Sequence, residues 1–267
     1  MTSSNSGDQL LFQRDGAVAT VVFNRPAQRN AISYDMWLAL REHMSELAGD
    51  KKVRCVVFRG AGGEAFSAGA DIKDFPEHRY DSESAKTYGA AIEATLDAID
   101  EIPKPTISMI EGFCVGGGLE LASATDIRIA ARGSRYGIPV ARLGITAGFK
   151  EMRRIVRLAG AGNASYIALS GELLDAENAF RIGLLTELVA PEALEDRVYG
   201  LARRMAELAP ISHADHKEII RTVADNPGLA GMTDEEFALQ YRVFDTDDFK
   251  EGLSAFVEKR KPRFKGN

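Results

Sequence analysis

Hydrophobic positions fall into two alternating patterns between residues 10 and 190. Short apolar runs of strand length lie at residues 10–14, 17–24, 53–59, 105–110, 126–130 and 186–189. Between them, apolar residues recur with helical spacing at residues 33–49, 83–101, 150–158, 163–170 and 176–182. Strands that alternate with helices in this way are typical of an α/β core.

Local signals add detail to this pattern. Asp15-Gly16 separates the first two apolar runs and predicts a β-hairpin. The run at residues 53–59 is continuously apolar, as expected for a strand that is buried on both faces of a sheet. Residues 60–70 and 134–148 carry neither pattern, so we predict irregular structure there.

The pattern changes near residue 191. Beyond that point the sequence indicates helices only, which are separated at Pro210, at residues 226–228 and at the acidic residues 245–248. We therefore predict three parts: a disordered N-terminus (residues 1–9), an α/β core (residues 10–191) and an α-helical C-terminal region (residues 192–267). We expect the helical region to carry a subunit interface.

Composition narrows the class of protein. The 267 residues are 45% hydrophobic and 27% charged, which is ordinary for a soluble globular protein. The formal net charge of −6 disfavours nucleic acid as a partner, and no apolar run is long enough to span a membrane. The first seven residues lack the features of a signal peptide. Because the two cysteines are too few for a disulfide framework, we predict a reduced, cytoplasmic protein.

The first stretch that can carry chemistry spans residues 104–126. A strand pattern leads to three consecutive glycines (Gly116, Gly117 and Gly118) and then to a helical pattern with Glu120 in its first turn. A glycine turn before a helix N-terminus aims backbone N–H groups at a negatively charged oxygen, and a nearby carboxylate is a candidate acid or base. The alternative is a tight strand–helix connection with a capping glutamate.

A second stretch, at residues 65–75, has the sequence AFSAGADIKDF. It also follows a predicted strand, and the small residues Ala68, Gly69 and Ala70 would let a ligand lie against the backbone. Two backbone donors, one from each stretch, would form an oxyanion hole if they pointed at one position. The alternative is an ordinary turn of small residues.

Taken together, these stretches resemble the crotonase, or enoyl-CoA hydratase/isomerase, family. The opening NRPAQRNAIS and the closing GLSAFVEKRKPRFKG also resemble family motifs, and the likeness extends over about residues 11–264 with its spacing preserved. The resemblance implies a crotonase-like spiral of ββα repeats with an α-helical C-terminal trimerisation region. It further implies an acyl-CoA thioester substrate, no separate cofactor or metal, and assembly as homotrimers or dimers of trimers.

The resemblance also assigns roles to residues. The backbone N–H groups of Ala70 and Gly117 would hold the thioester oxygen and so stabilise an enolate-like intermediate. Other positions match the family's substrate- and CoA-binding residues: Arg29, Ala31, Ala68, Asp71, Ile72 and Gly116, with Phe256 and Lys259 at the nucleotide end. For Arg29 and Lys259 the alternative is a solvated side chain.

Glu120 matches the first of two glutamates that flank the reacting carbons in the family's hydratases. Its position at a helix N-terminus would lower its pKa, whereas burial would raise it. Val140 occupies the place of the second glutamate. Valine can neither hold a water molecule by a charge-assisted hydrogen bond nor transfer a proton.

The next segment departs from the family pattern as well. Residues 145–154, ITAGFKEMRR, replace the glycine-rich turn that is usual in hydratases. We predict that Lys150 and Glu151 form a solvated helix start, with the alternative that Glu151 supplies the missing carboxylate. The sequence therefore favours an enoyl-CoA hydratase or isomerase with Glu120 as the single acid/base. A decarboxylase or C–C lyase, and a CoA-thioester binding protein without turnover, remain open.

Overall fold

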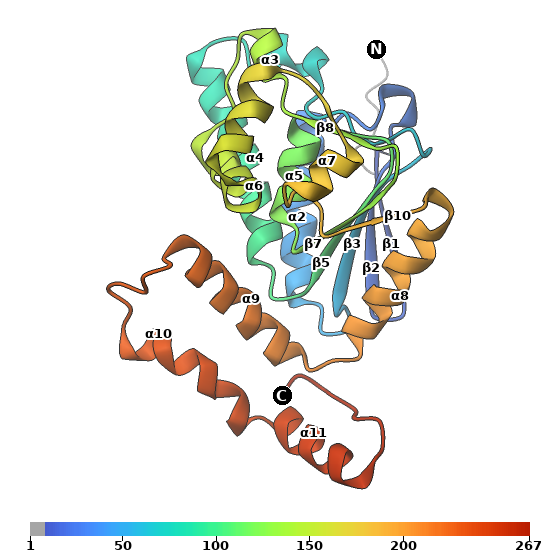
Figure 1. Cartoon of the computed structure of the whole chain (residues 1–267), viewed down its shortest axis with the longest axis vertical. Coiled ribbons are helices and arrows are strands. Elements are labelled where there is room, and N and C mark those ends of the chain that lie inside the picture. Colours follow the sequence, from blue (N-terminus) through green and yellow to red (C-terminus); the bar gives the residue numbers. More distant parts are fainter. Residues whose placement is uncertain (1–8) are drawn as a thin grey trace.

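The computed structural model describes residues 9–267, so the predicted disordered N-terminus lies outside the described residues except for Gln9. The strands form two sheets (Figure 1). The larger has the strand order β1 (Leu10–Asp15), β2 (Val18–Phe23), β3 (Cys55–Gly60), β5 (Thr106–Ile110), β7 (Ile127–Ala131) and β10 (Glu187–Val189). The smaller has the order β4 (Ala65–Ser67), β6 (Phe113–Val115), β8 (Arg135–Gly137) and β9 (Leu174–Asp175).

The larger sheet begins with the predicted hairpin. β1 and β2 pair in antiparallel fashion and are closed by the pair Asp15 and Val18. Gly16 in the turn has a φ of +57°, a conformation that glycine adopts without strain. The pairs from β2 to β10 are parallel, and Cys55–Phe58 in β3 is buried as the continuous apolar run predicted.

A strand–strand–helix unit occurs three times in succession. The units are β3-β4-α4, β5-β6-α5 and β7-β8-α6, with α4 at Ser82–Glu101, α5 at Gly117–Ala124 and α6 at Phe149–Ser170. In each unit the first strand joins the larger sheet and the second joins the smaller one. This is the ββα repeat that the resemblance implies.

The sequence pattern missed the second strand of every unit. β4, β6 and β8 have three residues each, too few for an alternation of polar and apolar positions to be recognised. The prediction of irregular structure is therefore wrong for β4 and β8, and residues 113–115 were not predicted as a strand. These strands form because β4 and β8 each pair in parallel with β6.

The predicted helices are present in the core. Ser33 caps α2 (Tyr34–Gly49), where its hydroxyl accepts a hydrogen bond from the Met36 N–H at 3.3 Å. The two helices predicted at 150–158 and 163–170 are the two arms of α6, which Gly160 interrupts with a non-helical backbone (φ 76°, ψ 159°). The shorter elements of the core are α3 (Phe75–His78), α7 (Ala176–Arg181), η1 (Pro26–Gln28), η2 (Ile72–Asp74), η3 (Val140–Leu143) and η4 (Pro191–Ala193).

Both faces of the larger sheet are covered. One face packs against α2, α4 and α5, and the other packs against α8 (Leu194–Ala206), whose buried side chains meet Val18, Cys55 and Val57. α8 therefore covers the sheet, although the predicted boundary at residue 192 places it in the helical C-terminal region.

The last helices lie apart from the sheets (Figure 1). They are α9 (Pro210–Asp225), α10 (Asp234–Ala238), η5 (Leu239–Asp245) and α11 (Asp247–Glu258). α9 is tied to the core by an ion pair from Lys217 Nζ to Asp126 at 2.8 Å, and the Arg54 guanidinium donates to the Phe264 carbonyl oxygen at 2.7 Å. Within residues 9–267, no helix combines the length and apolar character that crossing a membrane requires.

Candidate active site

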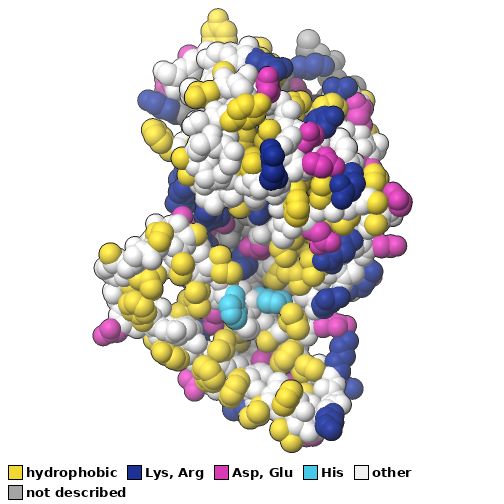
Figure 2. All heavy atoms as spheres, in the orientation of Figure 1, with side chains coloured by type: hydrophobic (Ala, Val, Ile, Leu, Met, Phe, Trp, Pro, Cys, Tyr) yellow, Lys and Arg dark blue, Asp and Glu magenta, His cyan; other side chains and the backbone are white. Residues whose placement is uncertain are grey.

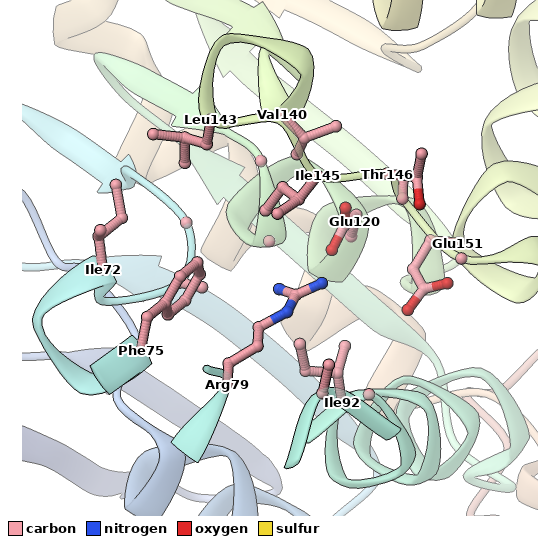
Figure 3. A pocket seen from close by; sticks show the side chains of 18 of the residues that line it. Ile72, Phe75, Arg79, Ile92, Glu120, Val140, Leu143, Ile145, Thr146 and Glu151 are labelled. Carbon is pink, nitrogen blue, oxygen red and sulfur yellow. The ribbon is translucent and has the colours of Figure 1, made fainter. Parts of the chain in front are cut away.

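A pocket of about 450 Å³ lies between four parts of the core (Figure 3). The loop after β4, the N-terminus of α5, the α3–α4 segment and the η3–α6 segment form its walls. Eight of the residues to which the family resemblance gives a place in the site line the pocket: Ala68, Ala70, Ile72, Gly116, Gly117, Glu120, Val140 and Glu151. The fold thus brings together two glycine-containing stretches and a third segment that lie far apart in the sequence.

The amides of Ala70 and Gly117 are neighbours. A Cβ atom added to Gly117 would lie 3.3 Å from the Ala70 nitrogen, and one added to Gly69 would lie 3.0 Å from the Gly117 nitrogen. Gly69 has a φ of +98°, so a side chain there would be strained as well as crowded. Glycine at these two positions therefore allows the two segments to approach backbone to backbone.

Hydrogen bonds to the neighbouring segment hold the loop that carries Ala70. The Ala68 N–H donates to the Arg29 carbonyl, the Ile32 N–H donates to the Gly69 carbonyl, and the Asp71 N–H donates to the Ile32 carbonyl, at 2.9, 2.8 and 2.9 Å. The Ala70 N–H donates none of these hydrogen bonds. Across residues 9–267, neither the Ala70 nor the Gly117 N–H has an acceptor in the protein, so both donors are available to a ligand.

Glu120 lies in the first turn of α5, a helix whose residues are all buried. Only 6% of Glu120 is exposed. Burial, reinforced by the negative charge of Glu151, raises the pKa of Glu120 to about 7, while the positive charge of Arg79 opposes the rise. The direction of the shift, which the sequence left undecided, is therefore upwards, with burial as its main cause.

Glu151 lies in the first turn of α6 and points into the same pocket (Figure 3). Only 5% of this residue is exposed, so the prediction of a solvated helix start is wrong for Glu151. It is right for Lys150, whose side chain is 45% exposed and pairs with Asp97 at 2.7 Å. The difference arises because α6 packs with one face on α5, and Glu151 is on that face.

The environment of Glu151 resembles that of Glu120. Its Oε2 atom is buried and has no hydrogen-bond partner among residues 9–267. Burial raises the pKa of Glu151, and the charge of Glu93 adds to the rise, whereas Arg154 and Arg79 oppose it. The pocket thus contains two carboxyl groups that hold their protons more tightly than carboxyl groups in water.

Sequence reasoning missed Arg79. It follows α3 and lines the pocket, and its guanidinium points towards Glu120 (Figure 3). The guanidinium carbon lies 5.2 Å from the centre of the Phe75 ring and 5.4 Å from that of Tyr88. A single cation ahead of the predicted helix at residues 83–101 gives no pattern, so only the packing of α3 against α4 could identify it.

The part of the pocket lined by η3 and the residues after it is apolar. Val140 lies in η3, and Leu143 and Ile145 extend the same wall (Figure 3). None of these three side chains can donate or accept a hydrogen bond.

Three predicted CoA-binding residues lie beside the pocket without lining it: Arg29, Ala31 and Asp71. Arg29 pairs with Glu64 at 2.7 Å and stacks over the Phe113 ring at 5.0 Å. The Asp71 carboxylate accepts from Arg25 at 2.7 Å and from the Lys73 N–H at 3.1 Å. Both side chains are therefore engaged by the protein.

Phe256 and Lys259 lie outside the pocket. They are in α11 and at its C-terminal cap, far from the α3–α4 segment (Figure 1), and Phe256 is 83% exposed. One chain does not bring these two residues to Glu120.

Other kinds of chemistry find little support. No group of histidine, cysteine, aspartate or glutamate side chains within residues 9–267 could hold a metal ion. Cys55 and Cys114 are buried, and burial raises the pKa of the Cys55 thiol to about 12 and that of Cys114 still further. A thiol with so high a pKa is a poor nucleophile.

Comparison with known proteins identifies the class to which this fold and pocket belong. The family model described as "Enoyl-CoA hydratase/isomerase" matches residues 13–267. The chain therefore belongs to the enoyl-CoA hydratase/isomerase family, and it is an enzyme of that family. The predicted family and the predicted crotonase-like fold are both confirmed.

Individual relatives cover nearly the whole chain. The chain is 32% identical over 261 residues to a crotonyl-CoA hydratase of Syntrophomonas wolfei, which covers 96% of this chain and 98% of the relative. It is 33% identical over 249 residues to an (E)-benzylidenesuccinyl-CoA hydratase of Thauera aromatica, and this match covers 93% of this chain and 96% of the relative. A crystal structure of an enoyl-CoA hydratase/carnithine racemase from Magnetospirillum magneticum matches with a TM-score of 0.93 and 38% identity. This match covers 97% of this chain and 96% of the chain in that structure.

Proposed function

We propose that the pocket binds a 2-enoyl-CoA thioester with its carbonyl oxygen at the Ala70 and Gly117 N–H groups, and that Glu120 transfers protons to and from the acyl chain. One observation carries this proposal: a buried glutamate with a raised pKa lies beside two neighbouring backbone donors that have no acceptor in the protein. The chemistry is that of an enoyl-CoA hydratase or isomerase.

The two backbone donors would act on the electrons of the substrate. When a nucleophile adds to the double bond, or when a proton leaves the carbon next to the carbonyl group, negative charge collects on the thioester oxygen. Two N–H groups already aimed at that oxygen stabilise the charge without any reorganisation. Gly116, Ala68 and Ile72 would hold the neighbouring atoms of the substrate in place.

Glu120 would act on protons. A carboxyl group with a pKa of about 7 is present in both protonation states at neutral pH, so it can accept a proton in one step and return it in the next.

We further propose that Glu151 supplies the carboxylate that Val140 cannot. Glu151 reaches the pocket from α6, a different helix from that of Glu120. Two carboxyl groups on two elements favour hydration, because one can take a proton from water while the other serves the acyl carbon. The apolar wall around Val140 favours the second candidate, double-bond isomerisation, which needs only Glu120.

The remaining parts of the proposal rest on the family resemblance. Arg29, Ala31 and Asp71 would bind the CoA arm and its adenine through groups on the rim of the pocket. CoA would enter only as part of the substrate, with no separate cofactor, and the protein would act in the cytoplasm. Since Phe256 and Lys259 are remote from the pocket of their own chain, they could reach the nucleotide end only from another copy.

The test compares turnover of crotonyl-CoA, a 3-enoyl-CoA and malonyl-CoA by the wild type and by Glu120→Gln. We expect turnover of the accepted enoyl ester to fall by roughly 10²–10⁴-fold in the variant, because glutamine cannot transfer the proton. Glu42→Gln removes the same charge from an exposed position of α2 and serves as the control. Unchanged turnover in Glu120→Gln would refute the role of Glu120.

The other outcomes separate the alternatives. Turnover of malonyl-CoA alone would indicate a decarboxylase. Binding of all three esters without turnover of any would indicate a binding protein.

Assembly as a homotrimer or a dimer of trimers is part of the proposal. Hydrophobic side chains gather over the α9–α11 region (Figure 2), and several of them are exposed in one chain: Ile220, Tyr241, Phe244, Leu253 and Val257. A patch of this kind favours association with another protein surface. We expect size-exclusion chromatography with light scattering to give three or six times the chain mass of 29.0 kDa. A peak at the mass of one chain would reject the assembly.

A further inference from the structure

We propose that the acyl group of the substrate carries a carboxylate of its own, and that Arg79 binds it. The natural ligand would then be a dicarboxylic acid joined to CoA through one carboxyl group. This inference rests on the proposed function only in taking an acyl thioester to occupy the pocket.

Arg79 differs from three arginines on neighbouring elements. Arg25, Arg29 and Arg154 each pair with a carboxylate of the protein, at 2.7 Å in every case. The structure gives the Arg79 guanidinium no ion pair and no hydrogen bond with any residue in the described range 9–267. It is nevertheless held in place, because it stacks over Phe75 and Tyr88.

None of the carboxyl groups of the pocket forms an ion pair with the Arg79 guanidinium. Glu120 and Glu151 lie close enough for the charge of Arg79 to oppose the rise in their pKa values, yet neither forms an ion pair with it. Glu93, the third acidic residue of the pocket, pairs with Lys150 at 3.7 Å. The hydrogen-bond donors of Arg79 are therefore left for a ligand.

The position of the guanidinium decides what kind of ligand suits it. It extends between Phe75 and Ile92 towards the centre of the pocket (Figure 3). A wholly apolar acyl chain would displace water from the guanidinium and leave its donors unpaired, which is unfavourable. A carboxylate would replace that water with charge-assisted, bidentate hydrogen bonds, while Phe75, Ile92 and Ile145 would contact the hydrocarbon part of the chain.

Binding of two saturated thioesters tests the inference without requiring turnover. Isothermal titration calorimetry would compare glutaryl-CoA, which ends in a carboxylate, with pentanoyl-CoA, which has the same number of acyl carbons and no second charge. We expect the wild type to bind glutaryl-CoA more tightly. Arg79→Met should weaken glutaryl-CoA roughly 30-fold or more, leave pentanoyl-CoA within about 3-fold, and so reverse the preference.

Two further variants make the result specific. Arg79→Lys keeps the charge but loses the planar pair of donors, so its preference for glutaryl-CoA should lie between those of the wild type and Arg79→Met. Lys51→Met removes one positive charge from an exposed turn and should keep the wild-type preference, which controls for net charge. Equal binding of the two esters by the wild type, or equal weakening of both by Arg79→Met, would overturn the inference.

The preference also separates this inference from the proposed function. A preference for glutaryl-CoA that depends on Arg79 would stand even if Glu120→Gln changed no turnover. Conversely, turnover could depend on Glu120 while the wild type shows no preference for glutaryl-CoA. That result would support the proposed function and reject only the inference that the acyl group carries a carboxylate.

Discussion

The pocket has an amide wall, formed by residues 68–70 and 116–117, and a side-chain wall, formed by Arg79 and residues 140–151. The amide wall consists of backbone that follows the three-residue strands β4 and β6. Hydrogen bonds to Arg29 and Ile32 fix the part after β4, and the Gly116 N–H donates to the Gly137 carbonyl in the part after β6. The side-chain wall consists of side chains on η3, on the segment that leads into α6, on the first turn of α6 and at the end of α3, and several of them are exposed, such as Leu143.

The difference teaches which parts of the chemistry are general and which are particular to this protein. Any thioester presents the same carbonyl oxygen, so a wall of backbone donors suits every substrate of the class. The acyl group and the proton transfers vary, and in the proposed binding mode they would face the wall whose side chains can be replaced without altering the backbone.

Among changes within the two walls, the largest expected effect comes from disturbing the amide wall. In Gly117→Ala the new methyl group would lie 3.3 Å from the Ala70 nitrogen and 3.1 Å from the Trp37 ring, so it would crowd the proposed site of the thioester oxygen. We expect turnover to fall by about 10²–10³-fold, as for the loss of one oxyanion donor. Gly49→Ala adds a methyl group in open space and is the control. Full activity in Gly117→Ala would contradict the proposal that the amide wall binds the thioester oxygen.

The next largest expected effect is that of Glu120→Gln on the free energy of unfolding. Its folded pKa of about 7 exceeds the ordinary value of 4.5, so the unfolded state binds fewer protons between those pH values and the free energy of unfolding falls as pH rises through them. Glu120→Gln lacks this penalty. We expect it to be more stable than the wild type by up to about 3 kcal/mol at pH 8, and the difference to vanish near pH 4.5.

Urea unfolding at several pH values measures this difference. Glu42→Gln, on the exposed surface of α2, should show no comparable dependence on pH. If Glu120→Gln were no more stable than the wild type at pH 8, the buried carboxylate would carry no desolvation cost.

The smallest expected effect is a shift in the pH dependence of the turnover that Glu151→Gln retains, and it arises from the charge of Glu151 rather than from its proposed part in proton transfer. Turnover that needs Glu120 deprotonated should rise with pH through about 7, because the carboxylate must accept the first proton. Glu151→Gln removes a negative charge that raises the pKa of Glu120. The acid limb of kcat/KM should therefore move to lower pH, by less than about one unit because such interactions are screened. A limb that moved to higher pH would contradict the arrangement of the two carboxyl groups.

The two walls also differ in how far the sequence could predict them. The glycines and small residues of the amide wall mark its position directly, since close approach of two backbones requires them. The hairpin, α2 and α4 followed from periodicity in the same way. The strands β4, β6 and β8 could not be predicted, because three residues carry no recognisable alternation.

The side-chain wall was harder for a different reason. Lys150 and Glu151 are adjacent charged residues at a helix start, yet one is half exposed and the other is buried. Which of them faces inward depends on the rotation of α6 about its axis, and that rotation is set by contact with α5. Likewise, Arg79 is one cation in a connecting segment until α3 and α4 pack and turn it inward.

Gly148 has a consequence for how the family can diversify. It caps α6, and a methyl group at this position would collide with the buried Oε2 atom of Glu151. A side chain at residue 148 would therefore push the Glu151 carboxyl group away from its present position in the pocket. Substitution at the cap of α6 is thus a second way, besides substitution of residue 151 itself, to change where the acid lies in a member of this family.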